Sequence, residues 1–367
     1  MSSHQGNDAL LQLEALTVAR DFAAVLRLGA PLLTMPWGAD DLALIRFYLG
    51  QAHCRLVEPR EALVLLPPAR EQFERQGNER LAVEALDWEA SAWGLLEDPK
   101  ALAMENEALE RCRKVDPPRR QLEARILGHL ANMFVVTRAW SLAISYYEAA
   151  VAASSQVNDL LQLAKMHHGL GIAYQRLQNP ATARGHLDKA LALYSIESDL
   201  SAVYRVENDL GNLLLREGHL DAAERHFLNA LAGADKLQIN RRGRGFIVAN
   251  LGEVCLRSGR RQEARRYLED ALGMGEAFGE RIVVAEASML LGRLEEGLGC
   301  PELADDHYRT AIRALEVVDM PNRLRDCYVE YAQVLESRGD MQAAYRQLQL
   351  AMAAEKTTAT ETAVFGR

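Results

Sequence analysis

The sequence predicts an all-α solenoid of about nine helical hairpins, on three observations. A Leu-Gly pair recurs at a period near 40 residues, with glycines Gly171, Gly211, Gly252 and Gly292 spaced by 40, 41 and 40 positions. Alanines follow each of these glycines by twelve and by nineteen positions, and another glycine follows most of them by seven. A period of this length is the signature of a repeat architecture, in which each repeat is one supersecondary unit that buries its apolar face against its neighbours.

The alanine pairs extend the register over the whole chain. They are Ala183 and Ala190, Ala223 and Ala230, Ala264 and Ala271, and Ala304 and Ala311 in the central repeats. The outer frames begin at Leu11, Gly50, Glu89, Ala131 and Ala332, and their pairs are Ala23 and Ala30, Ala62 and Ala69, Ala101 and Ala108, Ala143 and Ala150, and Ala344 and Ala351. Alanine fills all eighteen slots, although only 55 of the 367 residues are alanine, so chance does not explain the pattern.

The residue types fit a pair of helices in each repeat. Positions seven apart lie on one helical face, so paired alanines allow a neighbouring helix to approach closely. The glycine slot has the same role on the first helix. Gly218, Gly259, Gly299 and Gly339 lie where a left-handed cap would end the first helix of a hairpin.

In chain order, the repeats start near residues 4, 43, 82, 124, 164, 204, 245, 285 and 325, within one solenoid over residues 4–355. Pro67-Pro68 fall inside a predicted helix, where we expect a kink or a break. The repeat at Glu89 matches poorly, which indicates either repeat drift or a hinge near residues 95–120. Residues 356–367 are expected to form a flexible tail or the start of a linker to a missing output domain.

Composition restricts the class of protein. With 49% hydrophobic and 25% charged residues, the chain is typical of a water-soluble protein. It lacks a long apolar run and a signal peptide, so we expect a cytoplasmic protein without a membrane partner. The five cysteines are far apart and form no CxxC pair, which is typical of reduced thiols. A net charge of −9 disfavours nucleic acid and favours a protein or peptide partner.

The repeat from Leu210 resembles the tetratricopeptide repeat, with Leu210, Gly211, Gly218, Ala223, Phe227 and Ala230 at the signature positions. Nearly the whole chain shares the resemblance, but the period is near 40 rather than 34, and the tryptophan and terminal proline slots are empty. The long-repeat variety is similar in both respects. The resemblance implies a right-handed superhelix that binds peptides or proteins on its concave face, which the first helix of each repeat lines.

The family's groove positions fall on a characteristic set of residues in this chain. The N-terminal end offers Phe47, Tyr48, Arg55, Leu86 and Trp93, which are largely apolar. The last two repeats offer Glu286, Glu296, Asp326, Glu330 and Glu336 against Arg293. The centre is basic and rich in amides, and its predicted peptide-binding residues are Arg125, Asn132, Lys165, His168, Arg176, Arg205, Asn208, Asn212, Arg216, Asn250 and Arg257.

These residue types point to an extended peptide with an acidic group. An asparagine side chain both donates and accepts hydrogen bonds, so spaced asparagines could hold a peptide backbone of any sequence. Arginines beside them could pair with a carboxylate or phosphate in a fork. We therefore predict an acidic peptide segment or C-terminal carboxylate near the fourth to seventh repeats. The alternative is that these residues form an ordinary solvated polar face.

Other motifs carry less functional meaning. Arg241, Arg242, Arg244, Arg257, Arg260, Arg261, Arg265 and Arg266 form a second basic cluster that nucleic acid could use, but most of them are expected to face away from the groove, in solvent or in internal ion pairs. P-loop, HExxH and nucleophile-elbow motifs are absent, so we expect no catalysis and no cofactor. Adjacent His167 and His168 lack a third metal ligand at suitable spacing, so we expect no metal.

Two functions remain open from the sequence. The first is a noncatalytic adaptor or sensor that binds a protein or peptide in the groove. The second is the N-terminal regulatory region of a larger bacterial signalling protein, such as a diguanylate cyclase or a transcription regulator. In the second case, self-association through an end of the solenoid would form a homodimer and cover the exposed last face.

Overall fold

The computed structural model describes the backbone of residues 3–237, 243–318 and 320–365, and the side chains of residues 8–354 within those ranges. The described residues form eighteen α-helices and no β-strand. The first ten helices are α1 Ser3–Val18, α2 Phe22–Leu32, α3 Ala39–Arg55, α4 Pro59–Arg75, α5 Glu79–Leu95, α6 Lys100–Lys114, α7 Arg120–Val136, α8 Trp140–Ser155, α9 Leu160–Arg176 and α10 Pro180–Ile196. The remaining eight are α11 Leu200–Glu217, α12 Leu220–Lys236, α13 Arg244–Arg257, α14 Arg261–Phe278, α15 Arg281–Gly297, α16 Pro301–Val317, α17 Pro321–Ser337 and α18 Met341–Phe365. The predicted all-α solenoid is confirmed.

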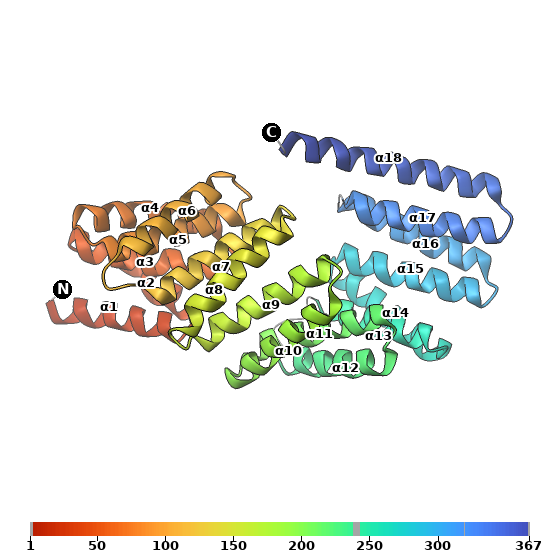
Figure 1. Ribbon diagram of the computed structural model, residues 1–367, viewed down its shortest axis with the longest axis horizontal. Helices are drawn as coiled ribbons and strands as arrows, with labels where there is room; N and C mark the ends of the chain where they lie inside the picture. Colours follow the sequence, from red (N-terminus) through yellow and green to blue (C-terminus); the bar gives the residue numbers. More distant parts are fainter. Residues whose placement is uncertain (1–2, 238–242, 319, 366–367) are drawn as a thin grey trace. The chain divides into compact units, whose positions relative to one another are not determined.

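The chain divides into two compact units, 1–197 and 198–367. The first contains α1 to α10 and the second contains α11 to α18, each as a series of antiparallel hairpins (Figure 1). The hinge predicted near residues 95–120 lies inside the first unit. One apolar cluster there includes Leu86 of α5, Leu109 of α6 and Leu127 of α7, and continues to Leu170 of α9. The helices around the proposed hinge therefore share a core.

Each odd-numbered helix is followed by a residue in the left-handed conformation. The predicted glycines Gly218, Gly259, Gly299 and Gly339 have φ between +77° and +85°. At the corresponding turns of the other hairpins, residues with side chains adopt positive φ: Arg20, Val57, Glu97, Arg138 and Gln178. The left-handed residue stops the first helix and turns the chain into the second.

These turns correct two of the nine predicted frames. A left-handed residue seven positions after the slot puts the first slot at Leu13 instead of Leu11, and Leu13 is buried whereas Leu11 is 58% exposed. The predicted pair Ala23 and Ala30 is accordingly exposed, and Val25 and Leu32 are buried in its place.

The frame of the third repeat is also shifted. Its left-handed residue is Glu97, which places the slot at Ala90 rather than Glu89. Ala90 is fully buried, and Ala101 and Ala108 still occupy the buried face of α6. The first buried alanine of the second helix, Ala101, thus follows the left-handed residue by four positions instead of five, and this explains the poor sequence match.

Close packing explains the glycines of the Leu-Gly pairs. A Cβ atom added at Gly171 or Gly252 would lie 2.6 Å from the side chain of Leu187 or Leu268. At Gly211 and Gly292 it would lie 2.6 and 2.8 Å from the rings of Phe227 and Tyr308. The second helix of each hairpin thus packs directly on the glycine backbone of the first. The sixteen alanines of the other eight frames are all buried, as predicted.

One local expectation differs from the structure. Helix α4 continues unbroken through Pro67 and Pro68, so the predicted break is wrong. Buried Leu66, Ala69 and Phe73 hold this part of α4 in the core, and their packing outweighs the backbone hydrogen bonds that the prolines cannot make. In segment 356–367, which was expected to be a tail or linker, the backbone is helical as far as Phe365.

Candidate peptide-binding surface

The predicted groove residues of the first unit lie on α7 and α9, the first helices of two consecutive repeats. Asn132 and Arg176 are exposed, whereas Lys165 and His168 are half-buried. Asn132 accepts a hydrogen bond of 2.6 Å from the hydroxyl of Tyr147, and the ring of His168 meets Tyr194 edge-on at 6.3 Å. Arg125 differs from the others, because carboxylates of the preceding repeat already hold its guanidinium.

The six predicted residues of the second unit lie on α11 and α13. Arg205 and Arg216 are exposed on the same face of α11, about three turns apart, and Asn212 is half-buried between them. Asn250 of α13 donates a hydrogen bond of 3.1 Å to Asn208 of α11. Arg257 of α13 donates a 2.7 Å hydrogen bond to the carbonyl oxygen of Leu215. The structure therefore joins both helices in one polar, basic strip of the second unit.

The acidic residues predicted for the last repeats are largely engaged with arginines. Glu286 pairs with Arg323, and Glu330 pairs with the predicted groove residue Arg293. Glu296 pairs with Arg338, whose guanidinium also lies 2.7 Å from Asp305. Because these contacts link consecutive repeats, much of the predicted acidic end acts as an internal ion-pair ladder.

A buried polar network joins three helices of the first unit. Arg125 Nε of α7 donates a 2.7 Å hydrogen bond to Asp87 Oδ2 of α5. His129 Nδ1 lies 2.9 Å from Asp87 Oδ1 and 3.2 Å from Glu105 Oε1 of α6. Asp87 and Glu105 have no exposed surface. A single imidazole thus lies between two buried carboxyl groups.

The pKa values of the titratable groups in this network are strongly shifted. Burial raises the pKa of Glu105, and the negative charge of Asp87 raises it further. Burial alone would also raise the pKa of Asp87, but Arg125 and His129 lower it to about 2. Burial opposes protonation of His129, yet Asp87 and Glu105 raise its pKa to about 9. At neutral pH, the favoured state has ionised Asp87, cationic His129 and neutral Glu105.

The same network is the cluster that could hold a metal ion among the described residues. One ligand atom from each of Asp87, Glu105 and His129 lies within 4.8 Å of the others. A carboxylate–carboxylate–imidazole set suits Zn²⁺ or Mn²⁺. However, metal binding would require neutral His129 and ionised Glu105, and Arg125 already neutralises Asp87. The charge distribution therefore fits a self-contained structural network better than a divalent-cation site.

Sequence reasoning missed Glu84 and Asp87 because of the one-residue frame error in the third repeat. In the corrected frame at Ala90, they lie six and three positions before the slot, where groove residues are expected. The earlier frame selected Leu86, which is buried in the core. Glu105 lies on the second helix of its hairpin and gave no comparable signal.

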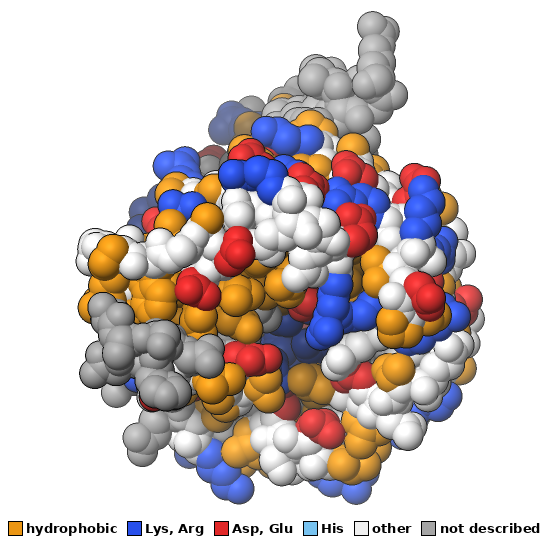
Figure 2. All heavy atoms as spheres, turned by 90° about the vertical axis from the view of Figure 1, so that its left-hand side faces the viewer, with side chains coloured by type: hydrophobic (Ala, Val, Ile, Leu, Met, Phe, Trp, Pro, Cys, Tyr) orange, Lys and Arg blue, Asp and Glu red, His pale blue; other side chains and the backbone are white. Residues whose placement is uncertain are grey.

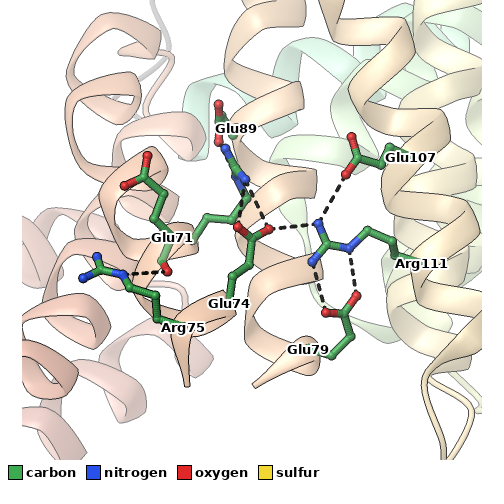
Figure 3. Close-up of polar contacts among 8 residues, drawn as sticks. Glu71, Glu74, Arg75, Glu79, Glu89, Glu107 and Arg111 are labelled. Atoms are coloured by element: carbon green, nitrogen blue, oxygen red, sulfur yellow. Dashed lines mark hydrogen bonds and ion pairs between the residues drawn. The ribbon is translucent and has the colours of Figure 1, made fainter. Parts of the chain in front are cut away.

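The surface of the N-terminal side carries a basic hollow. Figure 2 shows that Lys and Arg side chains lie within it and that apolar and acidic side chains surround it. Helices α4, α5 and α6 carry an ion-pair cluster (Figure 3). There Arg111 contacts Glu74, Glu79 and Glu107 at 2.8 to 3.2 Å. This cluster joins the second and third repeats by charge pairing.

The second basic cluster is mostly paired inside the chain, as expected. Arg260 Nη2 lies 2.7 Å from Glu224, and Arg265 Nη2 lies 2.6 Å from buried Glu295. Arg244 pairs with Asp235 at 2.8 Å. Arg241 and Arg242 lie outside the described residues. The described arginines of this cluster thus stabilise the helix packing more than they offer a phosphate-binding surface.

The histidine pair separates as its helical spacing requires. His167 of α9 faces His186 of α10, and their Nδ1 atoms are 3.0 Å apart. The cysteines show no disulfide, and four of the five are buried. In the part of the chain that the structure describes, no helix is long and apolar enough to cross a bilayer.

Comparison with known proteins identifies the repeat. A family model described as tetratricopeptide repeat matches residues 122–196 and 200–277. None of the curated proteins compared with the chain matches its sequence.

Several solved structures share the fold at low sequence identity. The apo form of RapI is 12% identical, covers 97% of this chain and 99% of its own, and has a TM-score of 0.73. The apo quorum sensor NprR from B. thuringiensis is 14% identical, covers 97% and 100%, and has a TM-score of 0.66. The Rap conjugation gene regulator of plasmid pLS20, solved with the Phr* peptide, is 16% identical, covers 80% and 94%, and has a TM-score of 0.51. Residues 122–196 and 200–277 therefore carry tetratricopeptide repeats, and the chain shares the helical-hairpin fold of these solved structures over nearly its whole length.

Proposed function

We propose that the chain is a cytoplasmic, noncatalytic sensor or adaptor that binds an extended acidic peptide segment along the first helices of its repeats. The observation that carries the proposal is the strip on α11 and α13. Its arginines Arg205 and Arg216 are exposed, and no ion pair with a carboxylate engages either of them among the described residues. This contrasts with Arg125, Arg293 and Arg338, whose guanidinium groups are held by neighbouring repeats.

The chemistry of the strip suits a peptide. Asn208 and Asn250 are joined by one hydrogen bond, which leaves further donor and acceptor capacity on both amides. Arg205 and Arg216 supply charge on either side of Asn212. A peptide backbone could bond to the amides while its acidic groups pair with the arginines. The pLS20 regulator, which has a similar fold, was solved with a peptide, and this supports the ligand class.

A charge-reversal experiment tests the proposal. Labelled acidic, neutral and basic peptides of equal length are titrated with the wild type, with Arg205→Glu/Arg216→Glu, and with Arg225→Glu/Arg261→Glu. The last pair changes the same charge on exposed positions of α12 and α14. Fluorescence anisotropy should show binding of the acidic peptides, more than about tenfold weaker in the first variant and unchanged in the second. Equal binding by all three proteins would contradict the proposal.

Self-association as part of a larger signalling protein is a second candidate, favoured by the surface of α18. Its side chains Met341, Tyr345 and Met352 are 63%, 61% and 61% exposed. Exposed large apolar residues grouped on one helix are typical of an interaction surface. Analytical ultracentrifugation of the wild type and Tyr345→Glu should then show a dimer that the substitution dissociates. A monomer at all concentrations would remove this candidate.

A further inference from the structure

Arg55 lies near Asp87 in the first unit, and no carboxylate engages it in an ion pair within the described residues. It lies in the last turn of α3, five positions after the Gly50 slot, which is a groove position. Its guanidinium carbon lies 4.6 Å from the centre of the Trp88 ring. Its Nε atom is buried without a hydrogen-bond partner. A buried N–H donor without an acceptor is rare in proteins and requires a reason.

Trp88 also carries a buried hydrogen-bond donor without an acceptor. Its side chain is 2% exposed, and its indole Nε1 is buried without an acceptor. The guanidinium carbon of Arg125 lies 4.7 Å from the same ring. Two side chains in direct contact, Arg55 and Trp88, therefore each carry an unused donor. In contrast, Arg125 is satisfied by Asp87 and Glu84.

The surrounding charge favours an anion. Arg55, Arg125 and cationic His129 outnumber ionised Asp87 and Glu84, and Arg20 adds a further positive charge nearby. Burial, followed by repulsion from Arg125 and Arg20, lowers the pKa of Arg55 to about 10. A guanidinium without an ion-pair partner, among an excess of positive charges, attracts negative groups.

We propose that the first unit contains an anion-binding site in which Arg55, stacked on Trp88, holds a carboxylate or phosphate group. Arginine is suited to this role because its planar guanidinium binds either group with paired hydrogen bonds. The site does not depend on the acidic-peptide proposal, because Arg205 and Arg216 belong to the other unit. Its ligand is either a free small anion or the acidic group of a peptide.

Calorimetric titration distinguishes these sources. The probes are inorganic phosphate, glutarate, an acetylated hexa-alanine peptide with a free C-terminal carboxylate, and the same peptide with a C-terminal amide. The buffer is of low ionic strength, because salt screens such contacts. Binding of phosphate or glutarate assigns the site to free anions. Binding of the peptide with the free C-terminal carboxylate, without binding of phosphate, glutarate or the amidated peptide, assigns the site to a peptide terminus.

Substitutions at Arg55 test the assignment. Arg55→Gln should weaken the bound probe at least about tenfold, because it removes a charge-assisted pair of hydrogen bonds. Arg55→Lys keeps the charge without the fork and should give an intermediate affinity, which also guards against loss of fold in Arg55→Gln. Arg60→Gln, on an exposed position of α4, is the control and should bind like the wild type. Helical circular dichroism verifies each variant.

Two results would overturn the proposal. The first is wild-type affinity in Arg55→Gln. The second is the absence of binding for every probe at about 10 mM, a concentration at which even weak charge-assisted sites fill. Variants at Arg205 and Arg216 should leave these titrations unchanged, so that failure here is separate from failure of the acidic-peptide proposal.

Discussion

Replacing Glu105 by glutamine should stabilise the protein at alkaline pH. Burial, with the nearby charge of Asp87, raises the pKa of Glu105 to about 8, and one of its carboxyl oxygens is buried without a partner. The folded state therefore binds a proton that the unfolded state releases near pH 4.5, and the free energy of unfolding falls as pH rises from there to about 8. Since each pKa unit corresponds to about 1.4 kcal/mol, the shift from 4.5 to about 8 makes this loss on the order of 5 kcal/mol.

Urea unfolding followed by circular dichroism at pH 5 and pH 8.5 measures this effect. Glu105→Gln stays neutral, so it should match the wild type within about 1 kcal/mol at pH 5 and exceed it by about 4 kcal/mol at pH 8.5. The free energy of unfolding of Glu105→Gln should still decline from pH 6.5 to about pH 9. In this range the folded protein keeps the proton on His129 that the unfolded chain has released. Glu71→Gln, at an exposed position of α4, is the control and should change little at either pH. Equal pH profiles for Glu105→Gln and the wild type would refute the reasoning.

Further predictions concern the repeat geometry. Val57 has φ +63°, which β-branched residues avoid, so Val57→Gly should raise the free energy of unfolding by about 1 kcal/mol in urea titrations. Gly218 has φ +82°, so Gly218→Ala should lower the free energy of unfolding by ~1 kcal/mol. An unchanged free energy of unfolding would contradict the turn assignment. Gly211→Val should lower the thermal midpoint, at a cost of about 1 to 3 kcal/mol, because its Cβ would lie 2.6 Å from the Phe227 ring. A stable, unaltered Gly211→Val protein would contradict the close packing of the slot.

The sequence predicted the hairpin architecture because small residues are needed wherever two helices approach closely. Gly171 and Ala183 could be assigned from spacing alone, since larger side chains would collide with the facing helix. The predicted repeat frames were wrong in the two hairpins that achieve helix packing with a different residue pattern. The first hairpin packs through Val25 and Leu32, and in the third the left-handed residue lies one position closer to the first buried alanine of α6. Neither difference leaves a mark in the alanine pattern.

The candidate site was less predictable, because pairing between repeats depends on side-chain reach. Arg125 and Arg205 occupy equivalent positions in their repeats, yet Arg125 is held by Asp87 and Glu84, whereas the hydrogen bond of Arg205 among the described residues is to Ser201 of its own helix. The difference lies in the preceding repeat, which provides carboxylates to Arg125. A periodic pattern identifies a groove position but does not show whether its charge is already neutralised.

The most direct test of the central claim is a quantitative affinity capture from a lysate of the source cells. The baits are the wild type, Arg205→Glu/Arg216→Glu and the control pair Arg225→Glu/Arg261→Glu, each checked for helical circular dichroism. Binding along the first helices predicts a partner that the wild type and the control pair retain and that Arg205→Glu/Arg216→Glu loses. Recovery of the same partner at equal yield by all three baits would contradict the claim, because binding would then use another surface.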